Sequence, residues 1–301
     1  MRKRVTTGVA AAVLLTLAAA SASAGGRWYS PAYFWNVEDR DGMLRVEAKR
    51  ALNNRMFYLT LLVGVAALWP GLQEYLDGYW LGWAFGPFYY NRYEAWIWAY
   101  FHGLLPVFAA LLVALPAASS YLQDKQTGYR TFVLMRGEKI RYLWAKIISN
   151  FVAGGLVMLI PLLLLFVVTS IMLPAGLPER LRILDVGAFS HLYRPAPVLY
   201  ILILSGVGFL FGGVYATLAL SLSALTSSQY LVTAAPFVLF WAANFVLSIP
   251  GLARWAPPQV LGPLSVTSTS WVTVLTGLAV PAGISLLLFI YLWRKELRNA
   301  S

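Results

Sequence analysis

The chain has 301 residues, of which 59% are hydrophobic and only 12% are charged. Soluble globular domains carry about 25% charged residues, so this composition excludes an ordinary soluble domain and favours a polytopic membrane protein. The net charge of +11 does not indicate nucleic-acid binding, because the basic residues stand in short clusters between apolar stretches, where they orient membrane proteins. With no cysteine and two distant histidines, the sequence predicts neither disulfides nor a metal site.

The first 42 residues form an N-terminal extension whose role is open. Basic residues at 2–4, an apolar run over 9–20 and small residues at 22–24 are typical of a secretory signal peptide. Cleavage there would leave the next basic segment outside the cell, against the charge pattern described below. Three alternatives remain: the natural start is Met43, the segment lies in the membrane interface, or it is an extra helix that does not alter the topology.

Residues 43–56 predict a basic amphipathic helix on the inner membrane surface. Its apolar residues recur at helical spacing: Leu44, Ala48, Ala51, Leu52 and Met56. Its charged residues are expected on the other faces: Arg45, Glu47, Lys49, Arg50 and Arg55. Such a helix either serves as an anchor alone or also contacts a cytoplasmic partner, as an elbow helix does.

Residues 43–301 are expected to form one transmembrane domain with six spans. A helix needs roughly 20 apolar residues to cross the hydrocarbon core, and the stretches that meet this requirement are about 57–76, 96–120, 147–173, 198–225, 230–249 and 271–293. Their apolar centres contain no Asp, Glu, Lys or Arg. Because lipid cannot satisfy backbone polar groups and the runs lack the alternation of a barrel, we expect an all-α integral membrane protein.

The distribution of Lys and Arg predicts the orientation. Six lie between residue 27 and the first span, six in the connection 121–146 and three in the tail, giving 15 on one face, whereas the opposite face has five. Cytoplasmic segments carry the excess of positive charge. We therefore expect a multi-pass protein of the cell membrane, with the connection 121–146 and the C-terminus in the cytoplasm.

The connection 121–146 is the sizeable cytoplasmic loop between the expected spans. Gly128 and Gly137 bracket a short segment, and glycine commonly marks the ends of helices. We therefore expect a short helix across the mouth of the bundle. A charged loop of this kind can also be a solvated topology signal without further function.

The order of these segments resembles the permease subunits of type-2 ABC transporters. An amphipathic helix and two spans precede an acidic residue, a glycine, a short apolar segment, an arginine, a basic turn with tyrosine, and a lysine that leads into the third span. The matching residues are Asp124, Gly128, Arg136, Arg141, Tyr142, Lys146 and Asn150. The resemblance covers about residues 43–296 and implies six transmembrane helices with an N-terminal elbow helix.

The resemblance also implies that segment 129–136 is a coupling helix seated in a groove of a separate ABC ATPase subunit. The implied coupling residues are Asp124, Gly128, Tyr129, Phe132, Val133, Arg136 and Arg141. The sequence has no Gly-rich loop ending in Gly-Lys-Ser/Thr, so ATP and magnesium are expected on the partner and not on this chain. This chain would be a transport subunit rather than an enzyme, an exporter that pairs with a second permease subunit, identical or related, within membrane lipid.

The aromatic segment 69–101 and the glycines at 208 and 212 each allow two interpretations. Between Trp69 and Phe101, 14 of 33 residues are aromatic, which favours interfacial anchoring or an outer lip that receives an apolar or cationic substrate. Gly208 and Gly212 allow close helix approach, either within the subunit or between subunits.

The polar residues of the sequence do not favour the other classes of membrane protein. A secondary transporter usually carries acidic residues inside its spans, and an intramembrane enzyme needs a polar constellation, which neither His102 nor His191 has nearby in the sequence. A non-transporting membrane scaffold is the alternative that the sequence excludes least.

Overall fold

The computed structural model describes residues 42–80, 91–116, 118, 120–129, 139–176, 187–223, 225–262 and 270–298. Over these ranges the regular structure is helical and no strand occurs, which confirms the all-α expectation. The α-helices are α2 (Gly42–Leu52), α3 (Arg55–Trp80), α4 (Arg92–His102), α5 (Leu105–Ala114), α6 (Ser120–Gln126), α8 (Lys139–Met172), α9 (Pro197–Leu222), α10 (Gln229–Leu247), α11 (Pro258–Leu261) and α12 (Trp271–Arg298). Two short 3₁₀ helices, η2 (Ser190–Leu192) and η3 (Ala253–Trp255), lie in connections.

Five helices of the described ranges are long and apolar enough to cross a membrane, which indicates an integral membrane protein. They comprise Arg55–Gly78, Arg141–Met172, Pro197–Leu222, Gln229–Leu247 and Trp271–Tyr291. These five correspond to the first and the third to sixth apolar stretches of the sequence.

The second apolar stretch is not one continuous helix, contrary to the expectation for 96–120. Helices α4 and α5 meet at a bend of 67°. Gly103 ends α4 in an extended conformation, and Pro106, in the first turn of α5, has no N–H to continue the helical ladder. The Leu104 N–H instead donates to the Ala67 carbonyl oxygen of α3 at 2.7 Å, so the neighbouring helix stabilises the break.

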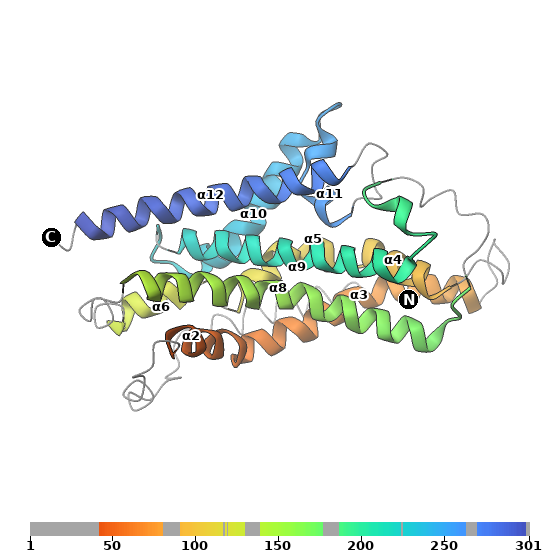
Figure 1. Ribbon diagram of the computed structural model, residues 1–301, viewed down its shortest axis with the longest axis horizontal. Coiled ribbons are helices and arrows are strands. Elements are labelled where there is room, and N and C mark those ends of the chain that lie inside the picture. Colours follow the sequence, from red (N-terminus) through yellow and green to blue (C-terminus); the bar gives the residue numbers. More distant parts are fainter. Residues whose placement is uncertain are drawn as a thin grey trace.

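The helices form an elongated bundle in which α8 and α9 pack along one another (Figure 1). Gly154 and Gly212 bring the two backbones together, because a Cβ at Gly212 would meet the Gly154 carbonyl oxygen. Gly208 packs against Leu162 of α8. The glycines at 208 and 212 therefore serve packing within the subunit.

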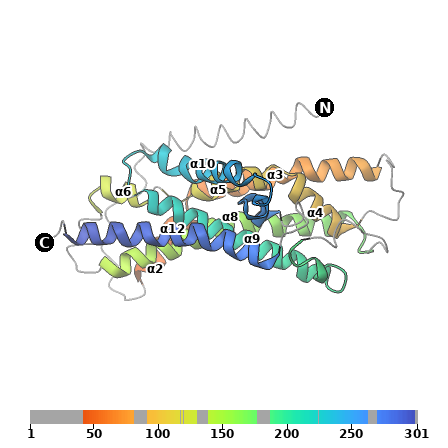
Figure 2. The same ribbon diagram turned by 90° about the horizontal axis from the view of Figure 1, so that it is seen from above.

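The two views place α2, α6 and the C-terminal end of α12 at the same end of the bundle, and α4 toward the other end (Figures 1 and 2). All three elements at the first end contain or adjoin segments that carry the predicted cytoplasmic charge. That end also contains the cluster of buried charges described next.

Candidate functional site

Helix α2 directs two of its charged side chains into the protein. The sequence pattern predicted an apolar inner face, yet Glu47 is only 3% exposed whereas Leu44 is 43% exposed. Glu47 and Arg50 are one helical turn apart and therefore share a face, and the Arg50 Nη1 donates to Glu47 Oε1 at 2.7 Å. The pattern misassigned this face because apolar spacing does not reveal that a buried partner of opposite charge is available.

The other charged residues predicted on the amphipathic helix lie elsewhere. Arg45 and Lys49 are exposed on α2. Helix α2 ends at Leu52, so Arg55, predicted to belong to it, instead begins α3 and is exposed there. The outward surface of α2 is consequently cationic, because its acidic residue turns inward.

Helices α6 and α8 supply the remaining members of the cluster. Asp124 of α6 is almost completely buried, as are Tyr142 and Lys146 of α8. Tyr142 and Lys146 are four residues apart, which places them on one face of α8, toward α2 and α6.

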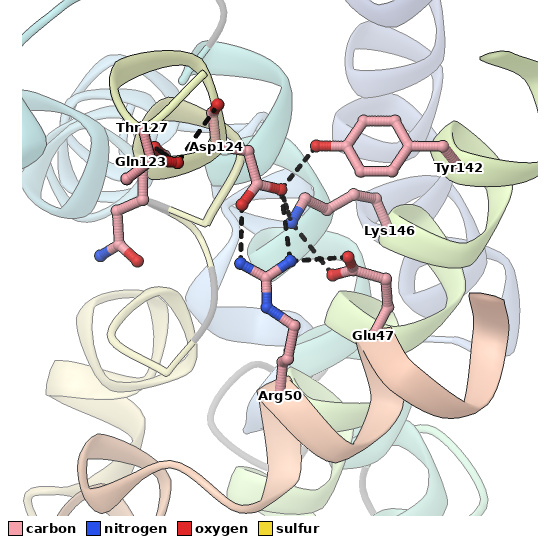
Figure 3. Close-up of polar contacts among 7 residues, drawn as sticks. All are labelled: Glu47, Arg50, Gln123, Asp124, Thr127, Tyr142 and Lys146. Atoms are coloured by element: carbon pink, nitrogen blue, oxygen red, sulfur yellow. Dashed lines mark hydrogen bonds and ion pairs between the residues drawn. The ribbon is translucent and has the colours of Figure 1, made fainter. Parts of the chain in front are cut away.

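The five side chains form one continuous network (Figure 3). Asp124 accepts from Arg50 Nη2 at 2.6 Å and from the Tyr142 hydroxyl at 2.6 Å, and it pairs with Lys146 Nζ at 2.5 Å. A longer contact of 3.4 Å joins Arg50 Nη1 to Asp124 Oδ2. Lys146 Nζ also donates to Glu47 Oε2 at 3.0 Å, which closes the ring of contacts between α2, α6 and α8. We call Glu47, Arg50, Asp124, Tyr142 and Lys146 the charge cluster.

Opposite charges balance within the charge cluster, which contains two cations and two carboxylates. Burial alone would raise the pKa of Asp124, but Lys146 and Arg50 lower it below its ordinary value. Burial opposes the charge of Arg50 as well, yet Glu47 and Asp124 raise the pKa of its guanidinium overall. Asp124 and Arg50 are therefore charged at neutral pH, and removing a partner of either leaves a largely buried charge without compensation.

Tyr129 links the charge cluster to the connection. The Arg50 guanidinium lies over the Tyr129 ring at 5.3 Å from its centroid, and the Tyr129 and Tyr142 rings meet edge to face at 6.3 Å. Gly128, just before it, has a φ of 76°, a left-handed conformation that glycine adopts without steric penalty. The chain thus turns at Gly128, and the next residue, Tyr129, packs against Arg50 and Tyr142.

The predicted coupling residues divide into three groups. Asp124 belongs to the charge cluster, and Gly128 and Tyr129 adjoin it. Arg141 is exposed on the first turn of α8. The apex residues Phe132, Val133 and Arg136 lie outside the described residues, as does the extension 1–41.

The geometry of the charge cluster suits mechanical connection rather than catalysis. Both carboxylates are occupied by cationic donors, so neither is placed as a general base. Over the described ranges, no three His, Cys, Asp or Glu side chains lie close enough to hold a metal ion. What the cluster does is fasten three helices together at one end of the bundle.

Glu47 and Lys146 were not paired by sequence reasoning, although a signal existed. Glu47 and Arg50 at i, i+3, and Tyr142 and Lys146 at i, i+4, each place two polar groups on one helix face beside a span. Such a face beside an apolar span requires partners, but the sequence does not say which distant segment provides them.

A scan against known protein families found no matching model, and searches of curated proteins and of solved structures found no significant match.

Proposed function

We propose that this chain is the membrane-spanning permease subunit of a type-2 ABC transporter, an exporter driven by a separate ATPase subunit that docks on the connection 121–146. The single observation that carries this proposal is the charge cluster. It fastens both sides of segment 130–138, through Asp124 before it and Lys146 after it, to the amphipathic helix α2.

A force applied to that connection would reach two spans directly. Lys146 lies in α8, which continues into a membrane-spanning segment, and α2 is followed by α3 after two residues. Packed helices joined by buried ion pairs move together, so an ATPase that shifts the connection would tilt α8 and α3 as one body. A solvated loop that served only to orient the chain in the membrane would not need buried ion pairs to α2.

The membrane topology in this proposal has six spans, the second being the bent pair α4 and α5. Helix α2 acts as the elbow helix, and the ends of α6 and α12 face the cytoplasm with it. The transport path is completed by a second permease subunit. Helices α10 and α12 have the most outward surface available for such a contact or for lipid, since only 17% and 28% of their most apolar segments are buried.

The coupling role is tested at the apex of the connection. Replacing Phe132 or Arg136 by Ala should weaken ATPase co-purification or uncouple hydrolysis from transport, because Phe132 would supply apolar contact and Arg136 a charge-assisted hydrogen bond worth about 1.5–3 kcal/mol. Lys125→Ala, on the exposed side of α6, is the matched control. The measurements are partner co-purification from native membranes and ATPase activity in vesicles.

Equal association and coupling in all three variants, with an active ATPase present, would contradict the proposal and favour a non-transporting scaffold. Expression and insertion should stay normal in each, since no span is altered.

A further inference from the structure

Two of the membrane-crossing helices carry exposed aromatic side chains near both of their ends. They are Tyr58 and Trp80 on α3, and Trp271 and Tyr291 on α12, each more than half exposed. The two residues lie 22 positions apart on α3 and 20 on α12, which is about 33 and 30 Å at the rise of an α-helix. The hydrocarbon core of a bilayer is about 30 Å thick, and tyrosine and tryptophan collect at its boundaries. These side chains therefore mark both surfaces of the membrane on two separate helices.

At one end of the bundle, an exposed arginine lies one helical turn beyond an exposed aromatic residue on each of three helices. These are Arg55 and Tyr58 on α3, Arg141 and Trp144 on α8, and Arg294 and Tyr291 on α12. We call them the arginine–aromatic pairs. Residues three positions apart share a helix face, so each arginine and its neighbouring ring face the same surroundings.

The arginine–aromatic pairs all belong to the end of the bundle that contains α2. Helix α3 follows α2 after two residues, the first turns of α8 contact α2 through the charge cluster, and the C-terminal end of α12 lies at the same end (Figures 1 and 2). The opposite end differs. Neither Trp80 nor Trp271 has a lysine or arginine within four residues in the sequence, and the exposed residue one turn before Trp80 is the acidic Asp77.

The surface at the α2 end is cationic beyond the three arginines. Arg45 and Lys49 of α2 are exposed there as well. Glu47 and Asp124 are buried and contact the cations of the charge cluster. Among the side chains that the structure describes at this end, the exposed charges are consequently all positive.

The chemistry of each arginine–aromatic pair fits the headgroup of a phospholipid. A guanidinium can bind phosphate through two parallel N–H donors, and a tyrosine or tryptophan ring suits the boundary because it has an apolar body and a polar tip. In each pair the arginine lies on the outer side of the ring, at the level of the phosphates when the ring is at the hydrocarbon boundary. Clustered positive side chains beside a membrane favour anionic lipids over zwitterionic ones.

We propose that each arginine–aromatic pair binds the phosphate of one anionic phospholipid in the leaflet at the α2 end, which gives three lipid sites per chain. The guanidinium holds the phosphate, the ring packs against the upper part of the acyl chains, and the cationic surface selects a lipid of net negative charge. Binding requires neither an ATPase subunit nor the connection 121–146, so it stands whether or not the chain is a transport subunit.

The test is native mass spectrometry of the purified full-length protein in detergent, which counts bound lipids and measures their affinities. Dioleoyl phosphatidylglycerol and dioleoyl phosphatidylcholine are the matched probes, because they share the acyl chains and the phosphate and differ in net charge. We expect three phosphatidylglycerol molecules to bind about fivefold more tightly than phosphatidylcholine. Arg141→Gln should remove one of the three. Lys125→Gln removes the same charge from the exposed side of α6, which is not a membrane-crossing helix, and should leave the count unchanged.

Two further variants and a third probe separate the pairs from a general effect of charge. Trp144→Leu keeps an apolar side chain and should weaken one site by about twofold to tenfold. A triple variant with glutamine in place of Arg55, Arg141 and Arg294 should bind the two lipids equally, and if it does not fold, the three single variants decide.

The proposal is overturned by equal binding of the two lipids to the parent protein, by an unchanged lipid count in the arginine variants, or by the same loss in Lys125→Gln. Displacement of phosphatidylglycerol by an equal concentration of inorganic phosphate would also overturn it, because the arginines would then bind a soluble anion rather than a lipid.

Discussion

Asp124 is the side chain on which the charge cluster depends most. It contacts Arg50, Tyr142 and Lys146, whereas Glu47 contacts only the two cations. Because four members are buried and the Arg50 side chain is only 14% exposed, a single substitution affects the cluster by leaving its partners unpaired rather than by removing one favourable contact. This property distinguishes the cluster from surface ion pairs, which contribute about 0–1 kcal/mol.

A double-mutant cycle on Glu47 and Lys146 should show strong coupling. Glu47→Gln and Lys146→Met each leave one uncompensated buried charge and should lower the free energy of unfolding by about 3–5 kcal/mol. The double variant restores charge balance through Arg50 and Asp124, so its loss should be smaller than the sum by about 0.5–3 kcal/mol. Unfolding of the purified protein in detergent mixtures measures all three, with the exposed Lys125→Gln as a control within about 0.5 kcal/mol of the parent. Additive losses would show that the two side chains act independently.

Asp124 should also make the stability depend on acidic pH. Its pKa is lowered in the folded protein, so its stabilising contribution is complete above the pKa of the unfolded chain, about 3.9, and is lost as the pH falls through the folded value. The midpoint of thermal unfolding should therefore fall below about pH 4 in the parent protein, and less steeply in Asp124→Asn. Asp77→Asn serves as the comparison. The same acid slope in the Asp124 and Asp77 variants would contradict the assignment.

Among the elements, α8 and α9 form the pair whose contact depends on glycine. Gly212 and Gly206 lie on the same helix, but only Gly212 faces another backbone, whereas a Cβ at Gly206 would meet nothing within 4 Å. Gly206 is flanked on its side of the helix by the exposed Leu202 and Leu210. The helix therefore has one side closed by α8 and one side open.

This difference predicts opposite results for one substitution at two sites. Gly212→Ala should lower the free energy of unfolding by about 1–3 kcal/mol, because the added methyl separates the two helices. Gly206→Ala should leave the stability unchanged or raise it by up to about 1 kcal/mol, because alanine favours helix. Thermal unfolding in detergent compares the two. Equal effects would mean that the contact between Gly154 and Gly212 does not limit the packing.

The elements that sequence reasoning found are those whose signal is local. Apolar runs of sufficient length identified α3, α8, α9, α10 and α12, because crossing lipid depends on composition along a single segment. Pro106 is a residue that can kink a helix, but the sequence did not predict that the second span would break into α4 and α5 at Gly103. Proline and glycine are tolerated inside membrane helices, and the break is decided by the Ala67 carbonyl on a different helix.

The candidate site was predictable only in part for the same reason. Arg50 was singled out before the first span in the sequence and Asp124 after the second. Their direct contact joins residues 74 positions apart, and the sequence did not predict it. Glu47 was assigned to a solvated face. Local periodicity describes which residues share a helix face, whereas the partner of that face is set by tertiary packing.

At the scale of the whole molecule, the orientation in the membrane is the property to establish first. The chain has no native cysteine, so single cysteines report accessibility without background. Lys125, in the last turn of α6, and Gly176, four residues after the end of α8, are both exposed. Lys125→Cys should react with an impermeant maleimide only after the cells are opened, and Gly176→Cys should react in intact cells. The reverse labelling pattern would overturn the cytoplasmic placement of the connection 121–146.

The separation of the charge-cluster residues along the chain also sets an order of events during synthesis. Glu47 and Lys146 are 99 residues apart, and translation proceeds at about 5–20 residues per second, so α2 is complete for about 5–20 seconds before its lysine partner exists. During that interval Glu47 has no counterpart on α8, and Arg50 has none on α6 until Asp124 is added 74 residues after it. A nascent or truncated chain that ends before Lys146 is therefore distinguishable from a finished one, because its α2 is not joined to α8.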